Sequence, residues 1–305
     1  MWDDSRLVVD VQSLSRRFGK QLALNQVDLQ IPPGMVVGLV GANGAGKTTL
    51  IKHLLGLYRA QAGSVRVLGR DPVRHPREVL REVGYLSEER ELPEWMRIHE
   101  LMNYVAAFYP SWDFEYCNEL LDAFGLDRNK QIKQLSKGMR AQVGLVAAVA
   151  QRPKLLILDE PSSGLDAIVR QDILKALVRT VAEDGKAALF SSHLLDEVEQ
   201  MSDYVVMIDR GRLVLQGTLE EIMSTHHIVV TPQSLDSHTL LSTNIKELSH
   251  QNTTSPHRYL LHGNKELIEE VCCSGVGSPF QIRCATLSEV FIARAGRSTN
   301  AIHED

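Results

Sequence analysis

The chain has 305 residues, of which 44% are apolar and 23% are charged, and its formal net charge is -5. These values are typical of a globular protein and exclude a disordered or fibrous chain. The net negative charge also argues against a nucleic-acid partner, because nucleic-acid-binding domains are usually basic.

The length predicts a large domain with a smaller neighbour. The four cysteines form no CxxC pair and no metal-ligand spacing, which favours a reducing cytoplasm. The N-terminus lacks the basic start and the apolar stretch of a signal peptide, and no apolar run approaches the ~20 residues of a membrane helix. We therefore expect a chain that does not enter a bilayer by itself.

The first strands predicted along the chain are Leu7–Val11 and a segment ending at Ile31, where apolar and polar residues alternate. Met35–Val40 is a near-continuous apolar run, as expected for a parallel strand that is buried on both faces. Lys154–Leu158 and Ala187–Phe190 have the same character. These runs predict the central strands of a buried sheet.

Helices are predicted between these strands, at Thr48–Leu57, Lys137–Ala150 and Ala167–Ala182. Strands that alternate with helices indicate an α/β core with a mostly parallel sheet. The region from Pro93 to Lys133 is rich in helix formers and poor in β-branched runs. We interpret it as part of a helical subdomain inserted into the core at about residues 88–140.

The end of the first domain is marked by a predicted hairpin of Tyr204–Ile208 and Arg212–Leu215. The composition shifts near Thr225, which predicts domains at residues 1–224 and 225–305. The second domain is predicted to be a small α+β unit of βαββαβ order with a terminal helix. Its expected strands are Ile228–Val230, Ile245–Leu248, Tyr259–Leu261 and Phe280–Arg283. Its expected helices are Leu235–Leu241, Lys265–Cys272 and Leu287–Arg294.

Residues 41–48 spell G-x-x-x-x-G-K-[ST] between a predicted buried strand and a helix start, which is the context that a P-loop requires. Its glycines let backbone N–H groups approach phosphates. Lys47 is expected to reach the β- and γ-phosphates of ATP, and Thr48 to ligate Mg²⁺. The nucleotide-binding residues predicted here are Gly41, Asn43, Gly44, Ala45, Gly46, Lys47, Thr48 and Thr49.

A second nucleotide signature is the apolar run Leu155–Leu158, which is followed by two carboxylates. Asp159 is expected to hold Mg²⁺. Glu160 can orient and deprotonate the water that attacks the γ-phosphate. An acidic pair at a strand end is often only solvated, but its occurrence together with a P-loop favours the catalytic interpretation.

The segment Leu135–Met139 resembles the signature motif of the ABC ATPases, in which a serine and a glycine at a helix start contact phosphate. Ser136 on its own would be an ordinary helix N-cap. Further matches to the family's motifs occur along the chain in the order that the family has. The resemblance covers residues from about 5 to 220. It implies nucleotide contacts from Ser136, Gly138, Asp166 of the D-loop and Phe18, whose ring would stack on adenine. It also implies a catalytic role for His193, the switch histidine.

The sequence departs from the family's pattern at two positions. Glu88 stands where the family usually has the Q-loop glutamine. A carboxylate can accept a contact from Mg²⁺ or from the attacking water, but it cannot donate a hydrogen bond. Lys137 replaces a common glycine of the signature, and we expect function to survive this change.

The resemblance implies an ATPase that uses ATP and Mg²⁺ and works as a head-to-tail homodimer. It also implies a separately encoded transmembrane permease subunit, so that the chain lies peripherally on the cytoplasmic face of the membrane. The signature and the closing segment Ala285–Phe291 resemble exporters of the drug and antibiotic type. A soluble ABC protein acting on ribosomes or DNA, and a catalytically dead regulatory module, are the alternatives. The run Leu92–Tyr104, in which Trp95 and Met96 are expected to be exposed, is either a docking surface or ordinary packing.

Overall fold

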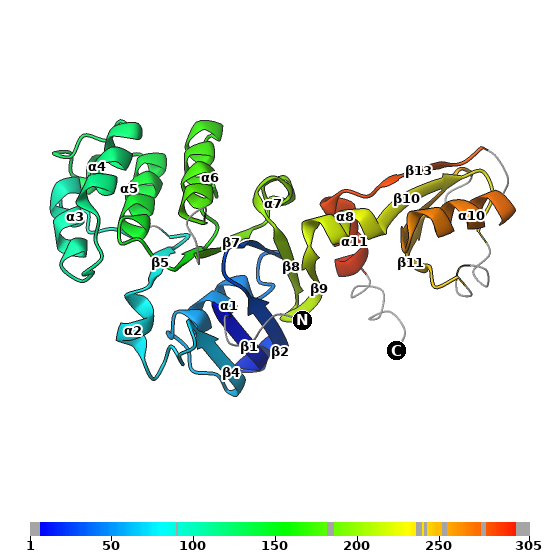
Figure 1. Cartoon of the computed structure of the whole chain (residues 1–305), viewed down its shortest axis with the longest axis horizontal. Helices are drawn as coiled ribbons and strands as arrows, with labels where there is room; N and C mark the ends of the chain where they lie inside the picture. Colours follow the sequence, from blue (N-terminus) through cyan, green and yellow to red (C-terminus); the bar gives the residue numbers. More distant parts are fainter. Residues whose placement is uncertain are drawn as a thin grey trace. The chain divides into compact units, whose positions relative to one another are not determined.

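The computed structural model describes residues 7–89, 91–181, 186–235, 240, 243–251, 255–275 and 279–296. The chain forms two compact units, Met1–Leu213 and Val214–Asp305 (Figure 1). The division lies eleven residues before the predicted boundary at residues 224 and 225. The reason is that helix α8 (Leu219–Thr225) contacts strands β10 and β13, so that it packs with the sheet of the second unit.

The predicted, mostly parallel sheet has strand order β5-β6-β7-β3-β8-β9. Its first five strands in this order belong to the first unit, and the division between the units falls within β9. Adjacent strands from β5 to β8 in this order pair in parallel. Strand β3 has all five residues buried, as its apolar run predicts. The strand bounds are Val83–Leu86 (β5), Leu155–Leu158 (β6), Ala187–Ser192 (β7), Val36–Val40 (β3), Tyr204–Asp209 (β8) and Arg212–Thr218 (β9).

A second sheet of the first unit is antiparallel, with order β2-β1-β4. Its strands are β1 (Val9–Phe18), β2 (Gln21–Ile31) and β4 (Ala62–Val67). Strand β1 extends seven residues beyond the predicted end at Val11. The pairing of β1 with β2 shifts register between Val11 and Leu14, and such an irregularity interrupts the alternation by which a strand is recognised in sequence.

The helices α3, α4 and α5 lie together at one end of the first unit, followed by α6 (Figure 1). They include the helical insertion predicted for residues 93–133. The helix bounds are Lys47–Leu54 (α1), Pro76–Leu80 (α2), Ile98–Ala106 (α3), Phe114–Ala123 (α4), Lys137–Val149 (α5), Ala167–Val181 (α6) and Leu195–Met201 (α7), with a 3-10 turn at Ile132–Gln134.

The core of the first unit joins both sheets through helix α1. Leu50, Ile51 and Leu54 of α1 are fully buried in a cluster that also contains residues of β1, β2, β3 and β6. Burying one such side chain contributes roughly 2 kcal/mol. Helix α1 is therefore fixed in the centre of the unit, with its first turn directly after strand β3 and the P-loop.

The second unit is built on an antiparallel sheet of order β11-β12-β10-β13. This order is that of a split βαββαβ arrangement, as predicted. The bounds are His226–Thr231 (β10), Lys246–Gln251 (β11), His257–His262 (β12), Gln281–Cys284 (β13), Lys265–Gly275 (α10) and Leu287–Gly296 (α11). The predicted helix Leu235–Leu241 falls mostly outside the described residues.

Within the run Leu92–Tyr104, the two residues singled out in the sequence differ in exposure. The side chain of Trp95 is 70% exposed, whereas Met96 is buried. The expectation that both face solvent is therefore wrong for Met96, which lies just before α3 and joins the packing of the helical subdomain. Among the described residues, no helix is both long enough and apolar enough to span a bilayer.

Candidate nucleotide-binding site

The loop between β3 and α1 bends back on itself and holds its own lysine. Lys47 donates from Nζ to the carbonyl oxygen of Gly41 at 2.6 Å. Gly46 precedes α1 with a φ of 115°. A Cβ atom at Gly46 would lie 2.7 Å from the carbonyl oxygen of Ala23. Only glycine fits this position, because both the backbone angle and the close strand exclude a side chain.

A cavity of about 360 Å³ lies over this loop. Nine of the residues predicted to act in nucleotide binding or hydrolysis line it, together with Gln21, Ala23 and Ala42. The nine are Phe18, Asn43, Gly44, Gly46, Lys47, Thr48, Thr49, Glu88 and Glu160. Gly41 and Ala45, also predicted to contact nucleotide, are buried and shape the loop from within; the N–H of Ala45 donates to the carbonyl oxygen of Ala42 at 3.1 Å.

Phe18, at the end of β1, forms an aromatic edge of the cavity. Its side chain is 40% exposed, so that part of the ring is available to a ligand. The ring is held by an edge contact with Tyr58, at 5.5 Å between centroids, and by the guanidinium of Arg16, 4.7 Å from the ring centroid. These contacts fix the ring where a purine could stack on it.

Lys47, Glu160 and His193 form a chain of polar contacts on one side of the cavity. Lys47 Nζ lies 3.0 Å from Glu160 Oε1, and both side chains are 6% exposed. His193 donates from Nδ1 to Glu160 Oε2 at 2.6 Å, because a carboxylate can only accept. The carboxylate is held from two sides in a poorly solvated setting, where such contacts are stronger than at the surface.

Ser191, near the end of β7, connects the carboxylate of Asp159 with the backbone of Glu160. Its hydroxyl donates to Asp159 Oδ1 at 2.6 Å and accepts from the backbone N–H of Glu160 at 2.8 Å. Glu160 has a φ of 47°, a left-handed conformation that costs a non-glycine residue about 1 kcal/mol. The hydrogen bond from its N–H to Ser191 helps to maintain this conformation.

Ser191 and Glu197 were not predicted from the sequence. A signal was available for Ser191, since it follows Phe190 at the carboxyl end of a strand adjacent to β6, and neighbouring parallel strands end at the same edge. Glu197 belongs to α7 and is 4% exposed. It accepts from the hydroxyls of Ser162 at 2.7 Å and Ser192 at 2.9 Å. It thereby connects the segment after Glu160 with the segment before His193.

Two residues that line the cavity carry oxygen atoms of the kind that Mg²⁺ prefers as ligands. They are Thr48, with its hydroxyl, and Glu88, with its exposed carboxylate. Asp159 is 1% exposed and approaches from the strand end. Among the described residues, no group of three or more His, Cys, Asp or Glu side chains is arranged to hold a metal ion. The donor set fits Mg²⁺ that arrives with phosphate oxygens, which complete its octahedral coordination.

The residues Ser136, Gly138 and Asp166 are outside the set that lines this cavity. Ser136 caps α5 by accepting from the N–H of Met139 at 3.2 Å, as its N-cap interpretation predicts. Asp166 accepts from the N–H of Ile168 and Val169, each at 3.0 Å. The helix starts of α5 and α6 are thus formed, but this chain does not bring them to its own P-loop.

The sequence matches the ABC transporter family over residues 24–163. An uncharacterized ABC transporter ATP-binding protein of Bacillus subtilis, YhaQ, is 32% identical over 95% of this chain and 99% of its own length. The lantibiotic transport ATP-binding protein SrtF of Streptococcus pyogenes is 35% identical over 68% of this chain and 90% of its own length. A solved ATP-binding subunit of an ABC transporter superposes with a TM-score of 0.66 at 31% identity, covering 70% of this chain and 91% of that chain.

Proposed function

This chain belongs to the ABC transporter ATP-binding proteins, and we propose that it hydrolyses ATP to drive export through a separately encoded membrane subunit. The observation that carries the proposal is the contact chain from Lys47 through Glu160 to His193 beside the P-loop cavity. It places a carboxylate base in direct contact with both a cation for phosphate and a histidine. A regulatory module without hydrolysis would not need this arrangement.

Binding of ATP is assigned to the P-loop and Phe18. Lys47 must exchange its contact with Glu160 for one with the β- and γ-phosphates, because its single ammonium now serves the carboxylate. This exchange releases Glu160 from its neutralising partner when the nucleotide arrives. The freed carboxylate is then a stronger acceptor for the proton of a water molecule.

Hydrolysis is assigned to Glu160 as the general base, with His193 as the residue that orients it. Thr48, Asp159 and Glu88 would hold Mg²⁺, which when bound supplies charge neutralisation to the phosphates. His193 donates to Glu160 Oε2, so the other carboxylate oxygen is the one that takes the proton of the water. Ser191 holds the carboxylate of Asp159 and the backbone of Glu160.

The site is proposed to be completed by a second copy of the chain in a head-to-tail dimer. Ser136, Gly138 and Asp166 have formed helix starts but are not part of the cavity in their own chain. A helix start with free N–H groups suits a phosphate. A two-fold axis would place each signature opposite the partner's P-loop and generate two equal sites.

The membrane partner is proposed to dock on the helical subdomain, which places the chain on the cytoplasmic face of the membrane. Trp95 and Tyr104 are 70% and 53% exposed there, and large exposed aromatic side chains are common at protein interfaces. Export is favoured by the likeness to SrtF, whose name states lantibiotic transport.

The proposal is tested by co-expressing the tagged full chain with a candidate membrane subunit, chosen as the product of a neighbouring gene with several membrane helices. We expect the two to co-purify from membranes and to hydrolyse ATP in a Mg²⁺-dependent manner, with hydrolysis lost in Lys47→Ala and co-purification retained. Movement of a fluorescent cargo into inside-out vesicles tests the direction. Co-sedimentation with ribosomes and none with membranes would contradict the proposal.

A further inference from the structure

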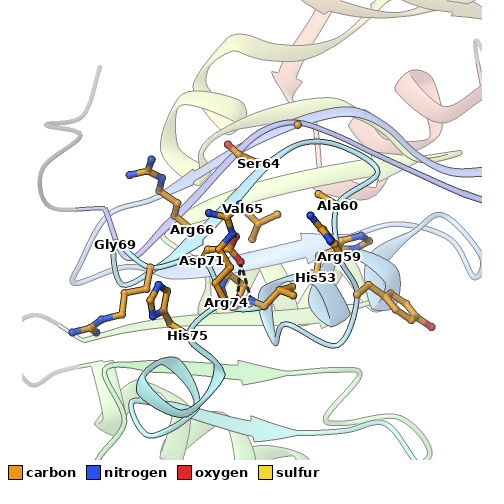
Figure 2. A pocket seen from close by; sticks show the side chains of 15 residues that line it. His53, Arg59, Ala60, Ser64, Val65, Arg66, Gly69, Asp71, Arg74 and His75 are labelled. Atoms are coloured by element: carbon orange, nitrogen blue, oxygen red, sulfur yellow. Dashed lines mark hydrogen bonds and ion pairs between the residues drawn. The ribbon is translucent and has the colours of Figure 1, made fainter.

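A second, larger cavity of about 640 Å³ lies beyond the C-terminal end of α1, away from the P-loop. Figure 2 shows its lining side chains, which come from the end of α1, from strand β4 and from the segment that precedes α2. None of the sequence motifs falls in it. Its most polar lining residues are His53, Tyr58, Arg59, Arg66, Arg70 and Arg74.

The cavity is strongly cationic in a chain that carries a net charge of -5. Four arginines line it, and Asp71 is the one acidic residue among its lining side chains. Asp71 is paired with Arg74 at 3.4 Å, and Arg70 is paired with Glu82 at 3.5 Å. Within the described part of the chain, neither Arg59 nor Arg66 forms an ion pair. Two guanidinium groups thus remain for a ligand.

His53 lies beneath the wall of the cavity. Its side chain is fully buried and donates from Nδ1 to the carbonyl oxygen of Thr49 at 2.8 Å. Because Nε2 of the same ring has no accessible surface, a ligand in the cavity does not reach it.

The cavity is connected to the nucleotide pocket by helix α1 and by one aromatic contact. Thr49 lines the nucleotide pocket and accepts from His53, which lines the second cavity. Tyr58 lines the second cavity and contacts the edge of Phe18, which lines the nucleotide pocket. The two cavities nevertheless have no lining residue in common.

We infer that this cavity is a second binding site, for a small polyanion that carries phosphate groups. The planar guanidinium groups of Arg59 and Arg66 match phosphate oxygens two at a time. The phosphate can belong to a free metabolite or to the headgroup of an anionic lipid. The inference concerns a site separate from the nucleotide pocket and does not depend on ATP hydrolysis.

The test is calorimetric titration of the full chain with inorganic tripolyphosphate while ADP saturates the P-loop. We expect a binding event that is at least about tenfold weaker in Arg59→Gln/Arg66→Gln, because charge-assisted hydrogen bonds to both arginines are lost. The matched control is Arg77→Gln/Arg81→Gln, which removes the same charge at exposed residues of α2 and its C-cap that do not line the cavity. The control is expected to bind within about twofold of the parent.

A second arm separates the two sources of phosphate. Sedimentation with phosphatidylcholine vesicles containing phosphatidylglycerol is measured for the parent and both double variants. If Arg59→Gln/Arg66→Gln loses tripolyphosphate binding and the control variant keeps it, the result supports a free metabolite. If Arg59→Gln/Arg66→Gln loses vesicle binding and the control variant keeps it, the result supports a lipid headgroup. Absence of binding to both probes, or equal weakening in the control, overturns the inference. A missing ADP event would instead count against the proposed function.

Discussion

The two units of the chain differ in how they satisfy the ionisable groups that they bury. In the first unit, Lys47, Asp159 and Glu160 are buried at the carboxyl edge of a parallel sheet and are held by one another and by Ser191. In the second unit, the buried polar residues among those described are His226, His227 and Thr231. Histidines can be buried uncharged, whereas a buried lysine and carboxylate need each other. The first unit therefore buries charged groups that pair with one another, whereas the buried polar residues described in the second unit can be uncharged.

The largest expected effect is in the first unit, on replacing Lys47 with Ala. The ammonium that offsets phosphate charge is lost, and Glu160 remains beside the phosphates without its neutralising partner. Titration with a fluorescent ATP analogue is expected to detect no tight binding. Lys52→Ala, on the same helix but outside the pocket, is the control. Equal affinity of Lys47→Ala and the parent for the ATP analogue would contradict the assignment of the pocket as the ATP site.

Glu160→Gln is expected to bind ATP nearly normally and to hydrolyse it roughly a hundredfold more slowly. The amide keeps the shape and still accepts from His193, but it cannot take a proton from water. Steady-state phosphate release by variant and parent, with Mg²⁺ and saturating ATP, measures the effect. A loss of less than about fivefold would show that another residue acts as the base.

In the second unit, burial lowers the pKa of His226 to about 4 from the ordinary value of 6.5. The folded state therefore resists protonation, so the stability that neutral His226 contributes is present above pH 6.5 and is lost as the pH falls towards 4. The loss is expected to reach about 3 kcal/mol. Hydrogen exchange of β10 and β12, corrected for intrinsic rates, should rise over this range and rise less in His226→Asn. The same pH response in both proteins would exclude His226 as the cause.

The smallest expected effect is that of Glu88→Gln. Glu88 and Glu160 both line the nucleotide pocket, so removing one carboxylate lowers the negative charge that faces the phosphates. Hydrolysis is expected to stay within about tenfold of the parent, and ATP to bind as well or slightly better. Glu89→Gln, the exposed neighbour outside the pocket lining, is the control. A defect as deep as that of Glu160→Gln would mean that Glu88 shares the role of base.

The sequence predicted those parts of the site that a motif marks, including Phe18 and Glu88, which lie outside the P-loop segment. The P-loop and the Asp159–Glu160 pair follow strands whose apolar runs are unambiguous, so their positions were predictable. Ser191 was not, because a single serine after an apolar run is common and its value depends on which strand lies beside β6. Pairing between distant strands is a tertiary property that periodicity does not encode.

The fold was predictable to a similar extent. The parallel sheet and the strand order of the second unit agree with the predicted elements. The burial of Met96 and the assignment of α8 to the second unit were missed, because both depend on contacts between separate elements. The cationic cavity was missed for the same reason, since Arg59 and Arg66 lie on different elements and carry no motif.

The proposed composite site is tested most directly by the mass of Glu160→Gln in solution with ATP and Mg²⁺. Analytical ultracentrifugation is expected to show a monomer without ATP and a dimer with it. Adding Ser136→Asp keeps a good N-cap but places a negative charge against the phosphate, and is expected to abolish the dimer. Adding Ser136→Asn keeps the cap without the charge and is expected to preserve it. A monomer in every condition, or equal dimerisation of the Asp and Asn variants, would contradict the proposal.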